Sequence, residues 1–108
     1  SIEALAVYPL EKWESVNEQL GRVRDTDEMG MNYLRYIMAN AETDMEMDAQ
    51  GRVLLPQTLR EEVGMTRDLT FVGMRDHIEI WDTARYADKT SKTREAFSQL
   101  RSHVNETY

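Results

Sequence analysis

The chain has 108 residues, of which 41% are hydrophobic and 31% are charged, a composition typical of a soluble globular protein with one modest core. It contains no cysteine, which excludes disulfides, thiolate zinc sites and cysteine nucleophiles. The formal net charge of −7 argues against nucleic-acid binding, because Lys and Arg supply most of that affinity; a local basic patch or several subunits acting together would have to overcome it.

The first predicted element is a short buried strand that leads into a helix. The apolar run Ala4 to Leu10 predicts the strand, and Pro9 ends it because proline suits the first turn of a helix. Apolar residues then recur at helical spacing from Leu10 to Val23, and Gly21 weakens or ends this helix. No apolar run approaches the roughly 20 residues that a membrane-spanning helix needs, so no membrane partner is expected.

A polar break separates this helix from a second one. Either Thr26 or Asp27 is expected to cap the second helix, which carries an apolar stripe and runs to about Asn40. The connection between the two helices has an ordinary length, so an αα-hairpin is predicted.

The hydrophobic period changes at Thr43 and predicts a β-turn-β unit followed by a helix. Residues 44–48 alternate strictly, which is typical of a strand, and residues 49–51 form a turn. Residues 52–55 predict a second strand, buried on both faces. Pro56 is expected to end that strand and to take the N1 position of a short helix, for which Gly64 is a C-cap candidate.

Two further strands and a helix complete the predicted elements. Residues 69–74 ("LTFVGM") and 78–81 ("IEIW") predict strands joined by a tight connection. Asp82 or Thr83 then caps a helix that is expected to run to about Val104, with a frayed end.

The two ends of the chain echo each other. Leu5 to Trp13 aligns without gaps on Ile78 to Tyr86, at an offset of 73 residues, with matching apolar and aromatic positions. The echo suggests two copies of one unit, of which the first has lost its front. The sequence also begins at Ser1 without an initiator methionine, so a trimmed or incomplete chain is expected.

The stretch "DAQGRVLLPQTLREEVGM", followed by "FVGMRDHIEIWD", resembles the second half of the MraZ family. These bacterial transcriptional regulators contain two tandem AbrB-like (SpoVT-AbrB) domains, each with an Asp-x-x-x-Arg motif. One copy is present here, from Asp48 to Arg52. The resemblance implies an α+β fold: an AbrB-like small barrel half of the swapped-hairpin or double-psi type, a helical hairpin before it and a C-terminal helix after it.

The resemblance also implies a division of the chain. Residues 1–13 are similar to the end of the first AbrB-like domain, 10–42 to the helical linker hairpin and 43–86 to the second domain, with 87–108 as the C-terminal helix and tail. The front of the first domain, with its own motif, is absent. Because the family's DNA contact is attributed largely to that N-terminal region, its absence favours the alternative of an assembly module without DNA binding of its own.

The function implied by the resemblance is sequence-specific DNA binding in transcription regulation. The family forms ring-shaped homo-oligomers that bind short direct repeats in the promoter upstream of a cell-division and cell-wall gene cluster, in the cytoplasm and on the nucleoid. An oligomer would in part answer the charge objection, since several weak contacts on one rim add by avidity. The sequence offers no sign of a cofactor, a metal site, a small-molecule substrate or an enzyme active site.

The candidate DNA-binding residues are Asp48, Arg52, Arg60 and Arg67. For Asp48 and Arg52 the structural reading is an ion pair or a turn cap. In the functional reading Asp48 holds Arg52, whose planar guanidinium reaches phosphate or a base. For Arg60, Arg67 and Arg75 a solvated surface role competes with phosphate contact. The same holds for the locally basic C-terminal cations Arg85, Lys89, Lys92, Arg94 and Arg101.

Other polar residues have structural interpretations. His77 and His103 are expected to be surface or capping residues, and the alternating carboxylates Asp44, Glu46 and Asp48 a solvated face rather than a cation site. Three functions stay open: the DNA-binding regulator, an assembly module without DNA binding of its own, and an AbrB-like antitoxin. The locally basic C-terminus gives the antitoxin little support.

Overall fold

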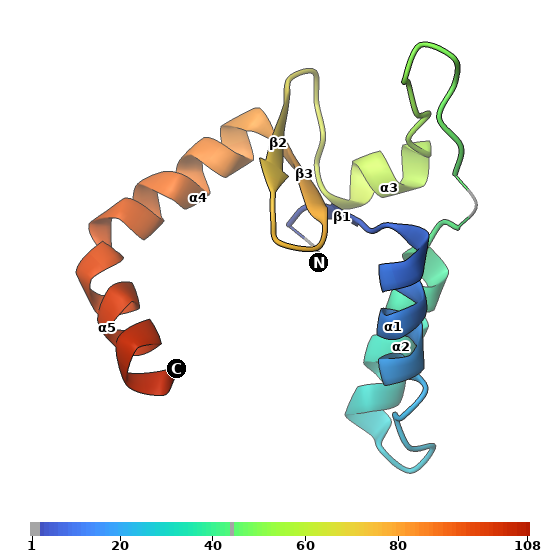
Figure 1. Cartoon of the computed structure of the whole chain (residues 1–108), viewed down its shortest axis with the longest axis horizontal. Helices are drawn as coiled ribbons and strands as arrows, with labels where there is room; N and C mark the ends of the chain where they lie inside the picture. The colour runs from blue at the N-terminus through green and yellow to red at the C-terminus, as the bar shows by residue number, and fades with distance from the viewer. Residues whose placement is uncertain (1–2, 44) are drawn as a thin grey trace.

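A computed structural model describes residues 3–43 and 45–108, and within these the chain forms five helices and three strands (Figure 1). The α+β prediction is therefore confirmed. In chain order the elements are β1 (Leu5–Val7), α1 (Leu10–Leu20), α2 (Glu28–Asn40), α3 (Gln57–Glu62), β2 (Leu69–Gly73), β3 (Ile78–Asp82), α4 (Thr83–Glu95) and α5 (Phe97–Thr107).

The three strands form one open antiparallel sheet in the order β1-β3-β2. β2 and β3 are a hairpin joined by residues 74–77, as their adjacent apolar runs predict. β1 comes from the other end of the sequence and pairs with the free side of β3. The pairing brings Leu5 onto Ile80, and both side chains are buried.

The register of β1 on β3 agrees with the sequence echo. The echo equates Leu5 with Ile78 and Val7 with Ile80, whereas the ladder pairs Leu5 with Ile80 and Val7 with Ile78. The equivalent residues therefore exchange places across the ladder, which is how two copies related by a two-fold axis pair. Every antiparallel pairing of two equivalent strands produces this exchange, so the duplicated unit stays a prediction.

Two ion pairs frame the same ladder. Lys12 of α1 contacts Asp76 before β3 at 3.2 Å, and Lys89 of α4 contacts Glu3 before β1 at 3.1 Å. Glu3 and Asp76 are 73 residues apart, and Lys89 lies one helical turn beyond the residue that corresponds to Lys12. Each exposed pair contributes about 0–1 kcal/mol, so their value is mainly to orient the helices that follow the paired strands.

The hydrophobic core is small and lies where α3 meets the sheet. Leu5, Val63 and Ile80 are buried, and Leu55, Leu59 and Met65 pack against them. Trp81 is also buried and packs on Tyr86 with the ring centroids 5.4 Å apart. The two aromatic residues therefore pack against each other within the chain.

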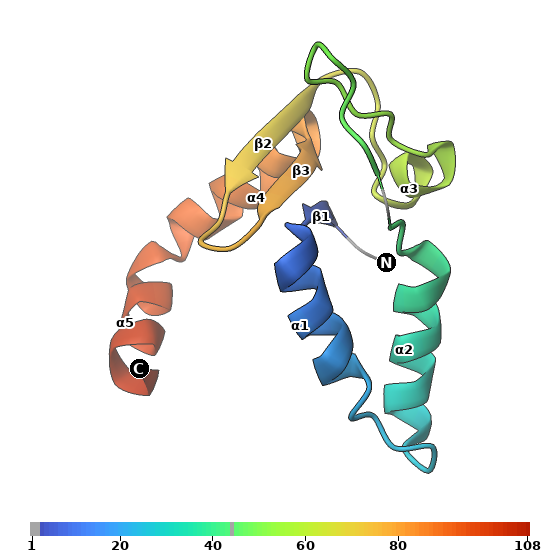
Figure 2. The same cartoon turned by 45° about the vertical axis from the view of Figure 1, so that its right-hand side comes forward.

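The helices outside the core extend away from the sheet. α1 and α2 run antiparallel from a connection at the far end of the hairpin, as predicted, while α4 and α5 form an arm on the opposite side of the sheet (Figure 2). The radius of gyration is 16.3 Å, whereas a compact domain of this length is expected near 13 Å. The described chain is therefore an open assembly of elements around a small centre.

The prediction of strands before α3 is wrong. Residues 45–48 and 52–55 are not paired as strands, and Asp44 lies outside the described residues. Val53 and Leu54 are exposed, so the second segment is not buried on both faces. The physical reason is the lack of a ladder partner: a two-stranded hairpin alone is marginal in water, and the sheet β1-β3-β2 does not extend to these segments.

Helix termini follow the sequence signals with two corrections. Asp27 accepts a hydrogen bond from Gly30 N–H at 2.9 Å and caps α2, in agreement with the prediction of Thr26 or Asp27. Pro56 is the N-cap of α3 and not its N1 residue. The single C-terminal helix is wrong as well: Ala96, with φ −97° and ψ 8°, ends α4 and starts α5. No glycine or proline marks that break in the sequence.

Candidate nucleic-acid interface

The Asp48–Arg52 segment is a tight, closed turn. Asp48 N–H donates to the carbonyl of Arg52 at 2.8 Å, and Gly51 N–H donates to the carbonyl of Asp48 at 3.0 Å. Gly51 has φ +80°, a conformation that L residues rarely adopt, which explains the glycine at this position. The turn geometry forms even though the flanking strands do not.

The Asp48 carboxylate organises the turn and the arginine together. Its Oδ1 accepts from the backbone N–H groups of Gln50 and Arg52 at 2.9 and 2.8 Å, and its Oδ2 accepts from Arg52 Nε at 2.9 Å. Arg52 Nη2 also donates to Gln50 Oε1 at 3.2 Å. The structural and functional readings of this pair are compatible, because the carboxylate that closes the turn also orients the guanidinium.

The Arg52 side chain is 74% exposed. Its Nη1 has no recorded hydrogen-bond partner among the described residues, so part of the planar donor fork faces solvent. The hydrogen bond from the Arg52 backbone N–H, together with those from its side chain and from Gln50, holds the pKa of Asp48 below its usual range. The carboxylate therefore stays ionised at neutral pH and keeps Arg52 oriented.

Arg60 and Arg67 lie on the elements that follow the turn. Arg60 is exposed on α3, and Arg67 is exposed in the connection between α3 and β2; neither forms an ion pair within the described chain. The acids beside Arg60 have other partners, since Glu61 accepts from Gln57 and Glu62 accepts from the Tyr36 hydroxyl.

The turn and the α3–β2 connection lie at one end of the molecule. Both views show them at the end opposite the tip of the α1–α2 hairpin (Figures 1 and 2). The end of α3 is fixed by Gly64 at φ +67°, with Met65 N–H bonded to the carbonyl of Arg60 at 2.9 Å. The sequence predicts Gly64 as the C-cap, whereas Val63 takes that position and Gly64 follows it in the left-handed conformation.

A partly buried polar network around Asp82, which the sequence did not reveal, holds this connection on the sheet. Asp82 Oδ1 accepts from the N–H and the hydroxyl of Thr66 at 3.0 and 2.7 Å, and its Oδ2 accepts from Arg85 N–H at 3.3 Å. Arg85 Nη1 in turn donates to the carbonyl of Val63 at 2.7 Å. Asp82 is thus the helix cap that was predicted and also the anchor of the segment that carries Arg67.

The C-terminal cations are largely engaged in local contacts. Lys89 pairs with Glu3, Lys92 pairs with Asp88 at 3.1 Å, and Arg85 bonds to Val63. Their recorded contacts favour a structural role. Arg94 and Arg101 are exposed on the arm and have no recorded ion pair among the described residues.

His77 is not the simple surface residue that was expected. Its ring stacks on Tyr8 with the centroids 4.7 Å apart, and its Nδ1 lies 2.6 Å from Asp76 Oδ1, so it joins the β2–β3 turn to the end of β1. His103 is exposed on α5, as predicted. Within the described ranges no cluster of three or more His, Asp or Glu side chains could hold a metal ion.

None of the helices among the described residues has the length and apolar character required to cross a membrane.

Residues 38–105 match the family model described as "MraZ protein, putative antitoxin-like". The chain belongs to the MraZ family. The matched region contains the Asp48–Arg52 turn, α3, the β2–β3 hairpin and α4, and it therefore covers every candidate site residue of this MraZ-family chain.

Proteins named "Transcriptional regulator MraZ" support the assignment. The relative from Lachnoclostridium phytofermentans is 37% identical over 102 residues, which are 94% of this chain and 69% of the relative. The relative from Desulfitobacterium hafniense strain Y51 is 35% identical over 94 residues, which are 87% of this chain and 65% of the relative. The chain thus spans about two thirds of their length. They are named as regulators and not as enzymes, in agreement with the expectation from sequence.

Proposed function

We propose that this chain is part of a sequence-specific DNA-binding transcriptional regulator that acts as a homo-oligomeric ring. Its targets are short direct repeats in a promoter upstream of a bacterial cell-division and cell-wall gene cluster, so it works on the nucleoid in the cytoplasm. The relatives' printed name, transcriptional regulator, supports the regulatory part. In this proposal residues 43–86 are the second AbrB-like domain, and 1–13 the end of a first.

The observation that carries the DNA contact is the preset Arg52 turn. A phosphate or a guanine edge is best met by a guanidinium whose plane is already fixed, because less side-chain entropy is then lost on binding. Asp48 and Gln50 fix Arg52 in this way and leave one of its terminal nitrogens toward solvent. Arg60 and Arg67 are proposed as additional phosphate contacts.

Assembly of several copies overcomes the repulsion between DNA and a chain with a net charge of −7. One chain offers a few cations and repels DNA elsewhere, so a single contact is weak. Several copies on a ring bring several Arg52 turns to repeated sites, and each contact after the first is intramolecular and adds through effective concentration. The proposal therefore predicts weak binding to one site and strong binding to repeats.

The direct test of the Arg52 turn is the affinity of the Arg52→Ala variant for repeat DNA, measured by fluorescence anisotropy. Removal of an oriented phosphate or base contact from each subunit should weaken binding at least tenfold, which corresponds to about 1.4 kcal/mol. Arg22→Ala is the matched control, because Arg22 is also exposed but lies at the tip of the α1–α2 hairpin, at the other end of the molecule (Figure 2).

The expected control result is an affinity within twofold of the unchanged chain. Equal decreases in Arg52→Ala and Arg22→Ala would mean that only net charge matters, and an unchanged affinity in Arg52→Ala would remove the role given to the turn. Asp48→Asn separates orientation from charge: it adds no positive side chain yet frees Arg52, so affinity should fall even though a negative charge has been removed.

The alternative is an assembly module without DNA binding of its own. The net negative charge favours it because that charge opposes contact with phosphates, and the large exposed surface favours it because it leaves area for contacts with other copies. The same anisotropy experiment separates the two functions. Repeat DNA that fails to bind at low salt, where electrostatic attraction is strongest, would leave assembly as the function of this region.

A further inference from the structure

α5 carries an apolar stripe that nothing in the described chain covers. Phe97, Leu100 and Val104 have the i, i+3, i+7 spacing of one helix face, and each residue keeps 45% to 59% of its surface exposed. α5 contains no buried residue. An exposed apolar stripe on a helix that has no buried residue indicates a surface that packs against a partner.

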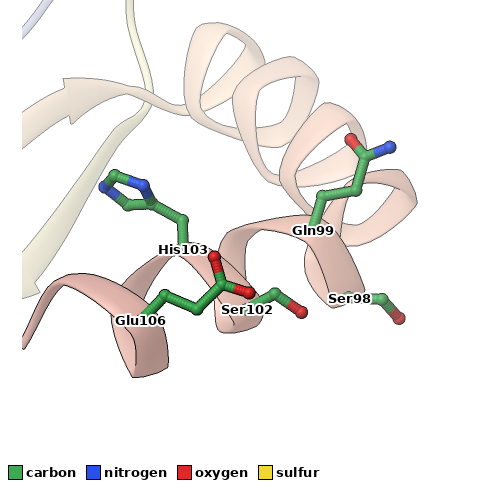
Figure 3. Close-up of a pocket in the computed structure, with 5 residues that line it drawn as sticks. All are labelled: Ser98, Gln99, Ser102, His103 and Glu106. Carbon is green, nitrogen blue, oxygen red and sulfur yellow. The ribbon is translucent and has the colours of Figure 1, made fainter.

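The other side of α5 is polar. Ser98, Gln99, Ser102, His103 and Glu106 line a shallow surface depression, and all five side chains come from this one helix (Figure 3). At 100° per residue, Ser98, Ser102 and Glu106 lie away from the centre of the apolar stripe. The helix is therefore two-faced, and the polar side provides positions for control substitutions.

The exposed area of the chain leaves ample surface for a partner. The described structure exposes 9069 Å², whereas a compact monomer of this mass is expected to expose about 6200 Å². The excess of about 2900 Å² exceeds the roughly 1600 Å² that a standard stable interface buries in total. The arm and the α1–α2 hairpin, which extend away from the sheet, account for the open shape (Figures 1 and 2).

A complementary apolar face exists on α2. Met29 and Tyr33 are four residues apart and lie on one side of the helix, with 84% and 57% of their surfaces exposed. Glu28 precedes them, and Asp25 lies in the connection before α2. This face offers a thioether and an aromatic ring, both suited to packing against Phe, Leu and Val.

The two surfaces carry opposite charge. The hairpin, residues 10–42, contains seven acidic and four basic residues, for a formal charge of −3, and the C-terminal arm, residues 83–108, contains five basic and three acidic residues, for +2. Arg101 flanks the apolar stripe of α5. In the described part of the chain no ion pair is recorded for Arg101, Asp25 or Glu28, so these charges are available to a second copy.

We propose that the apolar stripe of α5 in one copy docks on the Met29–Tyr33 face of α2 in a second copy, with the basic arm against the acidic hairpin. The contact joins different surfaces, so it is head-to-tail, and repetition closes a ring if the rotation allows it. The inference rests on the homo-oligomer of the proposed function but not on its DNA binding. It names the surfaces that build the oligomer.

The test is a complementation experiment on the 108-residue chain without DNA, read by light scattering or native mass spectrometry. Leu100→Asp disables the docking helix, and Tyr33→Asp disables the face that receives it. Each variant alone should fall to the single-chain mass of 12.6 kDa. Mixed together they should form a 1:1 complex of twice that mass, because the intact α5 of the Tyr33 variant meets the intact α2 of the Leu100 variant.

Controls keep the result specific. Ser102→Asp adds the same charge on the polar side of α5 and should keep the mass of the unchanged chain (Figure 3). Leu100→Ser and Tyr33→Ser form a milder second pair, and helical circular dichroism shows that each variant folds. Arg52→Ala should also keep the mass of the oligomer. A change in its DNA binding at unchanged mass therefore concerns the proposed DNA contact and not the docking of α5 on α2.

Three outcomes would overturn the proposal. One is a monomeric unchanged chain at micromolar concentration. Another is a folded Leu100→Asp variant with the mass of the unchanged chain. The third is a mixture of the two variants that stays monomeric, which would mean that α5 pairs with a second α5 or with another surface.

Discussion

At the scale of single residues, three aspartates each hold a different part of the structure in place. Asp48 closes the turn that orients Arg52, Asp82 fixes the α3–β2 connection to the sheet, and Asp76 joins Lys12 to His77. The sequence indicated the first task, because acid, glycine and arginine lie within five residues. It could not indicate the Thr66–Asp82 contact, since the partners are 16 residues apart.

These contacts give the fold a defined response to acid. Hydrogen bonds from the Thr66 hydroxyl and N–H, and then from Arg85 N–H, lower the pKa of Asp82, and contacts with His77 and Lys12 lower that of Asp76. A carboxylate with a lowered folded-state pKa contributes stability that is complete above its unfolded pKa, about 3.9 for Asp. That stability is lost as the pH falls through the folded pKa.

We therefore predict that the free energy of unfolding, measured by urea denaturation, is steady near pH 6 and falls as the pH drops below about 4. Asp82→Asn removes one of the titrating groups. It should lower the free energy of unfolding at pH 6, and that free energy should then fall less steeply below about pH 4. If the free energy of unfolding of Asp82→Asn falls below about pH 4 as steeply as that of the unchanged chain, Asp82 is not a source of the acid sensitivity.

At the scale of elements, local sequence signals succeed wherever an element carries its own stabilisation. The β2–β3 hairpin and the capped starts of α2 and α4 agree with prediction, and Gly64 lies one residue beyond the C-cap position predicted for it. The two segments around the Asp48–Arg52 turn are not strands, since a strand there needs a neighbouring strand that the described chain does not supply. The division into α4 and α5 has no glycine or proline signal and could not be predicted.

The core that joins these elements depends on a few side chains, above all Val63, which is fully buried at the end of α3. Val63→Ala should lower the free energy of unfolding by about 2–3 kcal/mol, from reduced transfer energy and the cavity left behind. Val53→Ala is the matched control, because Val53 is exposed outside the strands, and it should change stability by less than about 0.5 kcal/mol. Urea titration measures both, and equal effects would contradict this location of the core.

At the scale of the whole molecule, the open shape and the excess of acidic residues have a joint consequence for DNA binding. The chain has a small centre, a hairpin and an arm of opposite charge, and an arginine turn at the end away from the hairpin tip (Figure 1). Such a molecule has too few cations to bind DNA tightly alone. Its proposed activity therefore depends on the number of copies that act together.

The measurement that tests this account most directly is the affinity of the 108-residue chain for DNA with one repeat and with several, each followed against salt concentration. The account predicts tight binding only to several repeats, with log K falling steeply against log salt. The Arg52→Ala variant should have a shallower slope, by about 0.9 for each phosphate that Arg52 neutralises. Equal affinity for one repeat and several, or a slope unchanged in Arg52→Ala, would contradict it.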